Sequence, residues 1–288
     1  MARRIFKHFK LQAHSFIVSN FKQCSTMDKV HQSAVEGFQK GSAYDQHRPS
    51  YTDELITHAV SQLHTGGGDG VQYDILELGA GTGLCTRRML EKIPQGLRYL
   101  ASDFSEGFLT TLREQSPGVQ TQVFTANNIP LPDASVKNII CAQCFHWFAK
   151  EEALTEMMRV LVPQGRVMLL YNNKLYQTVP WLGEMEDVLT LYYGNTPRKF
   201  SGHWLNVIQA CQSLRLVEHK FLPGITNMKG DKQFIMDHYS TISVISRLQG
   251  SKREEALAGF QRVLDKHFPE DQEILLEMDS ELYCVEKL

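Results

Sequence analysis

The chain has 288 residues, of which 42% are hydrophobic and 22% are charged. This composition is typical of a globular protein with one large α/β domain, or of a core with a smaller cap, and it excludes a collagen and a wholly disordered chain. The 30 Lys and Arg against 32 Asp and Glu leave a formal net charge of −2, whereas a dedicated nucleic-acid binder needs a strongly basic face. The apolar runs are also too short to span a membrane. We therefore expect no nucleic-acid partner, no membrane insertion, and a monomer or weak dimer.

The N-terminal segment differs from the rest of the chain in its charge. Residues 1–27 contain five Lys and Arg residues and no acid, and aromatic side chains such as Phe6 and Phe16 lie between the charges. A basic, acid-free start resembles a mitochondrial presequence, and the alternative is a disordered extension ahead of Met27. We assign residues 1–37 to an N-terminal extension and expect a cytoplasmic protein, with a mitochondrial location as the alternative.

From about residue 50 the chain alternates helical and strand patterns, which is typical of a parallel α/β sheet. Residues 50–53 have the pattern of a helix capping box, and an apolar face at helical spacing follows them. The helix before the fifth strand is expected to stop at Pro163. Five strands are predicted in this part of the chain, over residues 73–78, 98–103, 121–125, 138–144 and 166–171.

The pattern changes after Asn173, because residues 174–211 are rich in aromatic side chains and lack the alternation of a strand. Beyond them the sequence predicts strands over 214–221 and 275–285 and helices over 232–248 and 252–266. Together these elements predict an α/β fold: a Rossmann-like, seven-stranded, mostly parallel sheet with helices on both faces and a helical lid inserted after strand five. The expected domains are 38–173 for the core and 174–288 for the lid and the completing strands.

The strongest local signal is the run Glu-Leu-Gly-Ala-Gly-Thr-Gly from Glu77 to Gly83, between a predicted strand and a predicted helix. Glycine lets the backbone turn sharply and approach a ligand closely, because no Cβ intrudes. Asp103 ends the next strand, 20 residues beyond Gly83, which suits a carboxylate that accepts hydrogen bonds from a ribose. The pattern favours a nucleoside site over a purely structural turn. It lacks the lysine of a P-loop, and Leu84 stands where the dinucleotide fingerprint needs glycine.

A G-x-G-x-G run preceded by an acidic residue resembles motif I of the class I S-adenosylmethionine-dependent methyltransferases. Four later segments are similar to further motifs of that family, in the same order: the acidic motif of the second strand, the adenine loop, the fourth-strand motif and a post-helix turn, at 100–105, 126–133, 142–148 and 156–165. The run Phe-His-Trp-Phe at 145–148, with Tyr44 and residues 48–51 upstream, resembles the small-molecule branch that includes trans-aconitate methyltransferase.

The resemblance implies S-adenosylmethionine as the cofactor and no metal ion. By this resemblance the glycine loop and Gln143 face the methionine moiety of the cofactor, and Arg48 meets its carboxylate. Asp103 binds the ribose. Phe104 lies against the adenine ring, and Ala126 and Asn127 lie at the edge of the adenine. The cofactor-binding residues are therefore expected to be Arg48, Gly79, Ala80, Gly81, Asp103, Phe104, Ala126, Asn127 and Gln143. The sequence departs from the family at Thr125, where an acid often accepts from the adenine amine, and at the peripheral positions Lys137 and Gln164.

Methyl transfer from a sulfonium is an in-line displacement, which proximity and alignment can largely catalyse. His146 is the titratable side chain beside the implied methyl position and is the candidate catalytic residue. It acts either as a base for a hydroxyl or amine or as a hydrogen-bond donor to a carboxylate, and the structural alternative is that it orders Trp147. The basic pair Arg198 and Lys199 either attracts an acidic acceptor or forms a solvated face. Five lid side chains either line the acceptor pocket or pack in the core: Trp204, Tyr239, Ser240, Ser243 and Arg247.

The sequence thus predicts a methyltransferase that acts on a small-molecule methyl acceptor, by O-methylation of a carboxylic acid in a closed apolar pocket with few polar groups. The alternative is a catalytically inactive partner subunit that binds adenosylmethionine. Six cysteines are scattered along the chain and predict no disulfide framework. The C-x-x-C of Cys141 and Cys144 is expected to pack in the core near the end of a strand.

Overall fold

The computed structural model describes residues 47–66 and 68–288, so the expected extension at 1–37, Met27 and Tyr44 lie outside the described residues. Within the described residues, seven strands form one sheet in the order β3-β2-β1-β4-β5-β7-β6. Their bounds are β1 Tyr73–Leu78, β2 Tyr99–Asp103, β3 Gln120–Val123, β4 Val136–Ala142, β5 Leu161–Lys174, β6 Leu214–Gly230 and β7 Ile274–Lys287.

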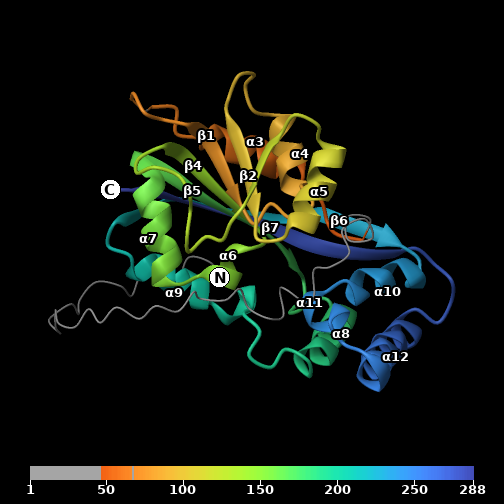
Figure 1. Ribbon diagram of the computed structural model, residues 1–288. Helices are drawn as coiled ribbons and strands as arrows, with labels where there is room; N and C mark the ends of the chain where they lie inside the picture. The colour runs from red at the N-terminus through yellow and green to blue at the C-terminus, as the bar shows by residue number, and fades with distance from the viewer. Residues whose placement is uncertain (1–46, 67) are drawn as a thin grey trace, which may run out of the picture.

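The sheet is parallel from β3 to β5, and β7 runs antiparallel between β5 and β6. The strand order reverses where β1 lies beside β4, and open α/β sheets bind their ligands at the carboxyl ends of the strands near such a point. The predicted seven-stranded, mostly parallel sheet is therefore confirmed (Figure 1).

Helices cover both faces of the sheet because successive strand residues point to opposite sides. Val167 and Leu169 of β5 belong to one core cluster, whereas Met168 and Leu170 belong to the other. The first cluster lies against α6 (Phe145–Phe148), α7 (Glu151–Val160) and α9 (His203–Ala210). The second lies against α3 (Asp53–Ser61), α4 (Leu84–Leu90) and α5 (Glu106–Gln115).

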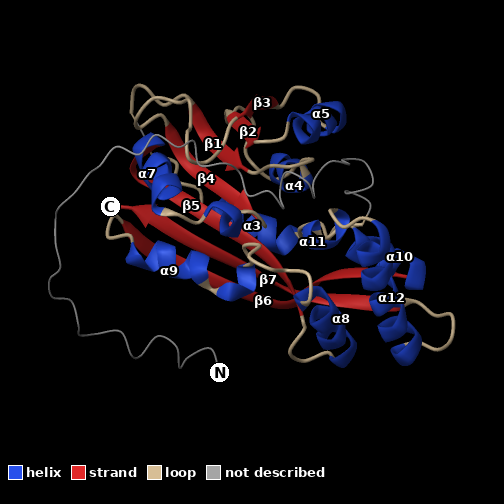
Figure 2. Cartoon of the chain, turned by 60° about the horizontal axis from the view of Figure 1, so that its bottom comes forward, coloured by secondary structure: helices blue, strands red, loops and turns tan. Residues whose placement is uncertain are grey.

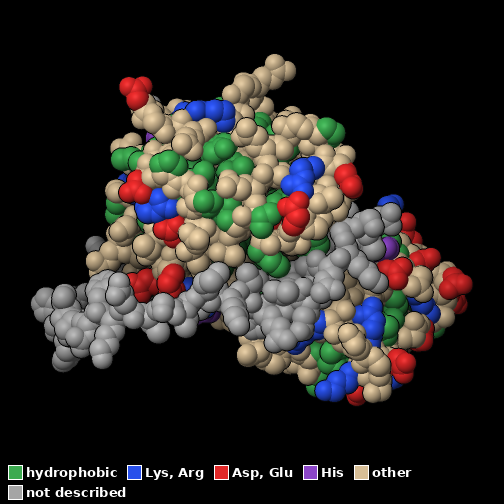
Figure 3. Space-filling model, in the orientation of Figure 1, with side chains coloured by type: hydrophobic (Ala, Val, Ile, Leu, Met, Phe, Trp, Pro, Cys, Tyr) green, Lys and Arg blue, Asp and Glu red, His purple; other side chains and the backbone are tan. Residues whose placement is uncertain are grey.

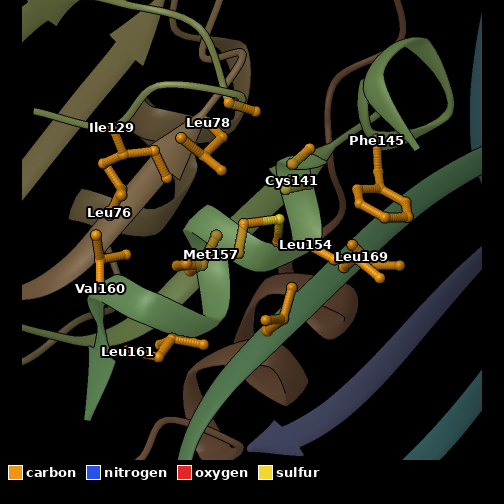
Figure 4. Close-up of a cluster of buried hydrophobic side chains, with 14 of the residues drawn as sticks. Leu76, Leu78, Ile129, Cys141, Phe145, Leu154, Met157, Val160, Leu161 and Leu169 are labelled. Carbon is orange, nitrogen blue, oxygen red and sulfur yellow. The ribbon is translucent and has the colours of Figure 1, made fainter. Parts of the chain in front are cut away.

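The core between α7 and the sheet shows how this packing fixes the strand ends. Leu154, Met157 and Val160 recur at helical spacing on α7, and all three are buried. They lie in one cluster with Leu76 of β1 and Cys141 of β4 (Figure 4). Burial of a large apolar side chain contributes about 2 kcal/mol, so many such contacts hold neighbouring strands in register.

The helices of the predicted lid come from two insertions rather than one. The segment between β5 and β6 contains α8 (Pro180–Thr190), the 3-10 helix η2 (Lys199–Ser201) and α9, and the segment between β6 and β7 contains α10 (Lys232–Ser240), α11 (Ser243–Ser246) and α12 (Gly250–His267). Helices α8, α10, α11 and α12 share a third hydrophobic core with the end of β6 and the start of β7 (Figure 2). Both strands are longer than predicted, because they carry these helices beyond the rest of the sheet.

Three local predictions are wrong. The helix before the fifth strand ends at Val160 and not at Pro163, and β5 begins directly after it at Leu161. Thr52, and not Ser50, caps the first helix, because its hydroxyl accepts a backbone N–H at 3.3 Å. The helix predicted over 232–248 is interrupted after Ser240. There the hydroxyls of Ser240 and Thr241 donate to carbonyl oxygens of the last turn at 2.8 and 2.7 Å, in addition to the backbone N–H of Thr241, which donates to the same carbonyls at 3.2 Å.

The described surface mixes charges of both signs. In Figure 3, Lys and Arg side chains lie beside Asp and Glu side chains on the visible face of the described residues. Asp53, for example, forms ion pairs with both Arg88 and Lys92. No helix in the described part of the chain has the length and apolar character needed to cross a membrane.

Candidate active site

A cavity of about 430 Å³ lies at the carboxyl edge of the sheet, where β1, β2, β4 and β5 end. The fold brings together all of the residues that the sequence analysis assigned to a site, although their roles stay predictions. These lining residues are Arg48, Gly79, Ala80, Gly81, Asp103, Phe104, Ala126, Asn127, Gln143 and His146.

The loop after β1 presents bare backbone to the cavity. Gly79 and Gly81 have φ angles of +67° and +58°, a left-handed conformation that favours glycine. A Cβ at Gly79 would lie 2.9 Å from the Cβ and Sγ of Cys144, whereas a Cβ at Gly81 would meet its nearest neighbour, Phe108, at 3.9 Å. Glycine at 79 is therefore required by the close approach of the loop to the end of β4, and the backbone at 81 has open space beside it. Cys144, expected in the core, lines the cavity.

Asp103 ends β2 and is held by the backbone around it. Its Oδ2 accepts the N–H of Gly81 and its Oδ1 accepts the N–H of Ser105, both at 2.9 Å. The residue is 5% exposed, and this burial raises the pKa of the carboxyl to about 6. Each carboxylate oxygen accepts more than one hydrogen bond, so both keep capacity for a ligand.

Glu77, the acidic residue ahead of the glycines, holds the loop in place through hydrogen bonds to residues of α4 and β2. It is buried, and its Oε2 accepts from the hydroxyls of Thr86 at 2.5 Å and Tyr99 at 2.7 Å. Burial raises the pKa of Glu77 to about 7. These bonds tie α4 and β2 to β1, and so they fix the two ends of the glycine loop.

The turn after β3 places Ala126 and Asn127 at the cavity. The N–H of Asn128 donates to the carbonyl of Thr125 at 3.1 Å and closes this turn. The Oδ1 of Asn127 is buried and has no hydrogen-bond partner among the described residues. A buried acceptor without a donor costs free energy, so this oxygen is suited to a donor on a ligand.

The end of β4 positions Gln143 and His146. Gln143 has a φ of +58°, and its Nε2 donates to the carbonyl of Asn172 at 2.9 Å. His146 lies on α6, and its ring centre is 5.5 Å from that of Trp147 and 6.1 Å from that of Tyr171. Burial lowers the pKa of His146 to about 3, and its buried Nδ1 has no partner in the described part of the chain. The ring is neutral at physiological pH and a weak base, so hydrogen bonding suits it better than proton abstraction.

The other end of the cavity is more polar than expected. The sequence predicted a closed apolar pocket with few polar groups. In the structure, β5 and the two insertions supply several polar lining side chains that the sequence analysis did not single out, including Lys174, Tyr176, Tyr193 and His238. The sequence signal was the polar run Asn-Asn-Lys at 172–174, directly after a buried strand, where parallel strands place functional groups.

The remaining basic and lid residues divide between cavity and core. Arg198 and Lys199 both line the cavity, and Arg48 donates from Nη2 to the carbonyl of Thr241 at 2.6 Å, at the turn between α10 and α11. Of the five lid residues that the sequence analysis considered, Ser243 lines the cavity, whereas Trp204 and Tyr239 are buried in hydrophobic clusters.

No group of three or more His, Cys, Asp or Glu side chains that could hold a metal ion is present within residues 47–66 and 68–288.

Residues 76–169, which run from β1 through β5 and include the glycine loop, Asp103 and His146, match the family model described as a methyltransferase domain. Residues 76–169 are therefore similar to a methyltransferase domain. The strand order and the glycine loop agree with the expected resemblance to the class I enzymes, a family that uses S-adenosylmethionine. The resemblance to the trans-aconitate branch is not tested by this match.

Two curated relatives agree with the methyltransferase domain. An uncharacterised methyltransferase-like protein of Schizosaccharomyces pombe is 42% identical over 169 residues, which cover 56% of this chain and 60% of that protein. An uncharacterised methyltransferase of Mycobacterium tuberculosis is 34% identical over 147 residues, 51% of this chain and 56% of that protein. The chain thus spans less than two thirds of the length of these relatives.

The fold is also similar to that of solved structures. A candidate type II methyltransferase from Anaeromyxobacter dehalogenans matches with a TM-score of 0.54 and 19% identity, covering 83% of this chain and 96% of that one. This likeness concerns the fold alone, and it extends beyond residues 76–169 to most of the described sheet.

Proposed function

We propose that this chain is an S-adenosylmethionine-dependent methyltransferase that methylates a small molecule on the oxygen of a carboxylic acid. The observation that carries the proposal is a cavity of about 430 Å³ at the carboxyl edge of the sheet, lined by residues of the matched region. The residues with the chemistry for the cofactor line one end of it, and cationic side chains line the other. A cavity of this size suits a small ligand.

The residues present fit the cofactor. Asp103 offers a buried carboxylate for two ribose hydroxyls, and the backbone at Gly81 leaves space for a ligand beside it. The buried Oδ1 of Asn127 offers an acceptor for the adenine amine, which replaces the acid that the family often has at the position of Thr125. The buried ring of Phe108 and the side chain of Phe104 add apolar surface beside the loop.

When bound, the cofactor supplies a methyl group activated by its sulfonium. The task of the protein is then to align the acceptor oxygen and to exclude water, because displacement at such a carbon depends mainly on proximity. A carboxylate is already ionised at neutral pH, so it needs no base, in agreement with the low pKa of His146. In this proposal neutral His146 donates a hydrogen bond that orients the acceptor.

The test is methyl transfer to the small-molecule fraction of a cell extract, with cofactor carrying a labelled methyl group. We expect label in small carboxylic acid esters, and we expect His146→Ala to lower turnover at least about tenfold while cofactor affinity stays within about twofold. His203→Ala, on an exposed side chain of α9 that does not line the cavity, is the matched control.

Each other outcome of this assay contradicts a stated part of the proposal. Label in protein or RNA fractions would show that the acceptor class is wrong. Tight cofactor binding without label in any fraction would favour the inactive partner subunit. Unchanged turnover in His146→Ala would remove the role given to His146.

A further inference from the structure

The end of the cavity opposite the glycine loop carries a concentration of positive charge. Both carboxyl groups that line the cavity, Glu77 and Asp103, lie at the cofactor end. Five cationic side chains line the cavity: Arg48 ahead of α3, Lys150 between α6 and α7, and Lys174, Arg198 and Lys199, which lie on β5, in η2 or directly before it.

Two of these cations already have partners. Lys199 donates to Oε2 of Glu281 at 2.7 Å, and Arg48 donates to the carbonyl of Thr241. Lys174 and Arg198 differ from them, because no carboxylate of a described residue lies within ion-pair distance of either side chain. Glu186 interacts electrostatically with both side chains from beyond ion-pair distance, so it compensates their positive charge only in part, and the remaining positive potential favours an anionic ligand.

Aromatic rings hold both cations in place. The Nζ of Lys174 lies 5.2 Å from the ring centre of Tyr239 and 5.7 Å from that of Tyr176. The guanidinium of Arg198 lies 4.5 Å from the ring centre of Tyr193. The hydroxyl of Tyr193 donates to Glu186 at 3.3 Å, and Glu186 does not line the cavity. The rings therefore fix the cations while leaving their N–H groups for a ligand.

We propose that Lys174 and Arg198 form an anion-binding subsite for a negatively charged group of the methyl acceptor. The proposal rests on the proposed function, since it names the residues that would select the acceptor. The planar guanidinium of Arg198 suits the two oxygens of a carboxylate, and the ammonium of Lys174 adds a compact positive charge.

The surroundings of Lys174 couple anion binding to proton uptake. Burial, with Arg48 nearby, lowers the pKa of Lys174 to about 7, so about half of the amine is neutral near neutral pH. The other groups around this amine are the carboxyl of Glu186, the neutral ring of His238 and the phenols of Tyr176 and Tyr239. A bound anion stabilises the ammonium, so the neutral amine takes one proton from water as the anion binds.

The test uses acetate as the probe and acetamide as its neutral isostere, with the full chain. Formaldehyde and cyanoborohydride methylate neutral lysine amines, and peptide mapping follows each lysine separately. Near pH 7 we expect Lys174 to react at least about tenfold faster than exposed Lys252 of α12, because far more of its amine is neutral. A rise of about one pKa unit on binding acetate lowers the neutral fraction about fivefold, so acetate should slow Lys174 about fivefold.

Acetamide should leave the rate at Lys174 unchanged, and neither probe should affect Lys252. The variant Arg198→Gln should lose most of the acetate effect, whereas Arg262→Gln, on an exposed side chain of α12, should keep it. Equal effects of acetate and acetamide, or an unchanged acetate effect in Arg198→Gln, would overturn the subsite.

Calorimetry with S-adenosylmethionine on the same preparations separates this proposal from the proposed function. Cofactor binding and methyl transfer, together with an unchanged rate at Lys174 in acetate, would overturn the proposed subsite but not the proposed function. An acetate effect without cofactor binding would remove the proposed function and leave the anion site standing.

Discussion

Replacing Asp103 with asparagine removes the charge at the cofactor end of the cavity with little change of shape. The carboxylate accepts the N–H groups of Gly81 and Ser105 and keeps capacity for two ribose hydroxyls. Two charge-assisted hydrogen bonds contribute about 1.5–3 kcal/mol each, and asparagine retains at best one neutral bond of about 1 kcal/mol. We therefore expect Asp103→Asn to weaken S-adenosylmethionine binding by about 2–5 kcal/mol, roughly 30- to 5,000-fold in Kd.

The pKa of Asp103, about 6, adds a pH dependence to this prediction. The ionised carboxylate accepts the ribose hydroxyls, so the affinity of the parent chain should fall as the pH drops through about 6. Because this pKa lies above the ordinary value of 3.8, the folded state holds a proton that the unfolded state has lost, and stability without cofactor decreases as the pH rises from about 4 to about 6. Above pH 6 the ionised Asp103 lowers the free energy of unfolding of the cofactor-free protein by roughly 3 kcal/mol. The Asp103→Asn variant has no carboxyl to ionise, so it does not lose this stability.

Calorimetric titration with S-adenosylmethionine between about pH 5 and about pH 8 measures the affinities, and thermal unfolding measures the stability. Asp69→Asn, on an exposed side chain away from the cavity, is the control for a simple change in net charge. A folded Asp103→Asn variant that binds like the parent, or that keeps the parent's pH dependence, would refute the placement of the ribose at Asp103.

Three further substitutions test the glycine loop and the loop between β3 and β4. Gly81→Val places a branched side chain in the left-handed region beside the cavity, and calorimetry should show cofactor affinity at least about tenfold weaker in a folded protein. Gly79→Ala brings a Cβ within 2.9 Å of Cys144 and should lower the free energy of unfolding by about 1–3 kcal/mol in urea, with partial rescue by Cys144→Gly. Arg159 of α7 donates to the carbonyl of Leu131, in the loop between β3 and β4, at 2.8 Å, and Arg159→Ala should cost about 1–3 kcal/mol in the same assay. An unchanged midpoint would contradict the inference that this bond holds the loop.

The sequence was most informative where local chemistry and chain order agree. The strands around the glycine loop were predicted closely, because Tyr73–Leu78 is a buried strand that ends directly at glycines with positive φ. Asp103 and Asn127 were predicted from spacing and resemblance, since Asp103 ends β2 and Asn127 lies in the turn after β3. Both candidate binding residues lie at or shortly after the end of a strand, so one pattern indicates the strand end and the candidate residue.

The opposite end of the cavity could not be predicted in the same way. Lys174 and Arg198 lie 24 residues apart, and only the fold of the segment between β5 and β6 brings them to one cavity. Tyr239 was considered as a pocket residue because aromatic side chains on a helix suit either environment, and the structure buries it in the third core. The low pKa of His146 likewise depends on burial by neighbours that are distant in sequence.

The two insertions separate the two ends of the cavity along the sequence. The family match ends at residue 169, just before Asn172, Asn173 and Lys174, and three of the cationic side chains that line the cavity, Lys174, Arg198 and Lys199, follow this boundary. Substitutions at the end of β5, in η2 or in α10 can therefore alter the side chains that line one end of the cavity without changing the glycine loop or Asp103. Under the proposed function, most of the residues that would select the acceptor and most of those that would hold the methyl donor thus lie in different halves of the sequence.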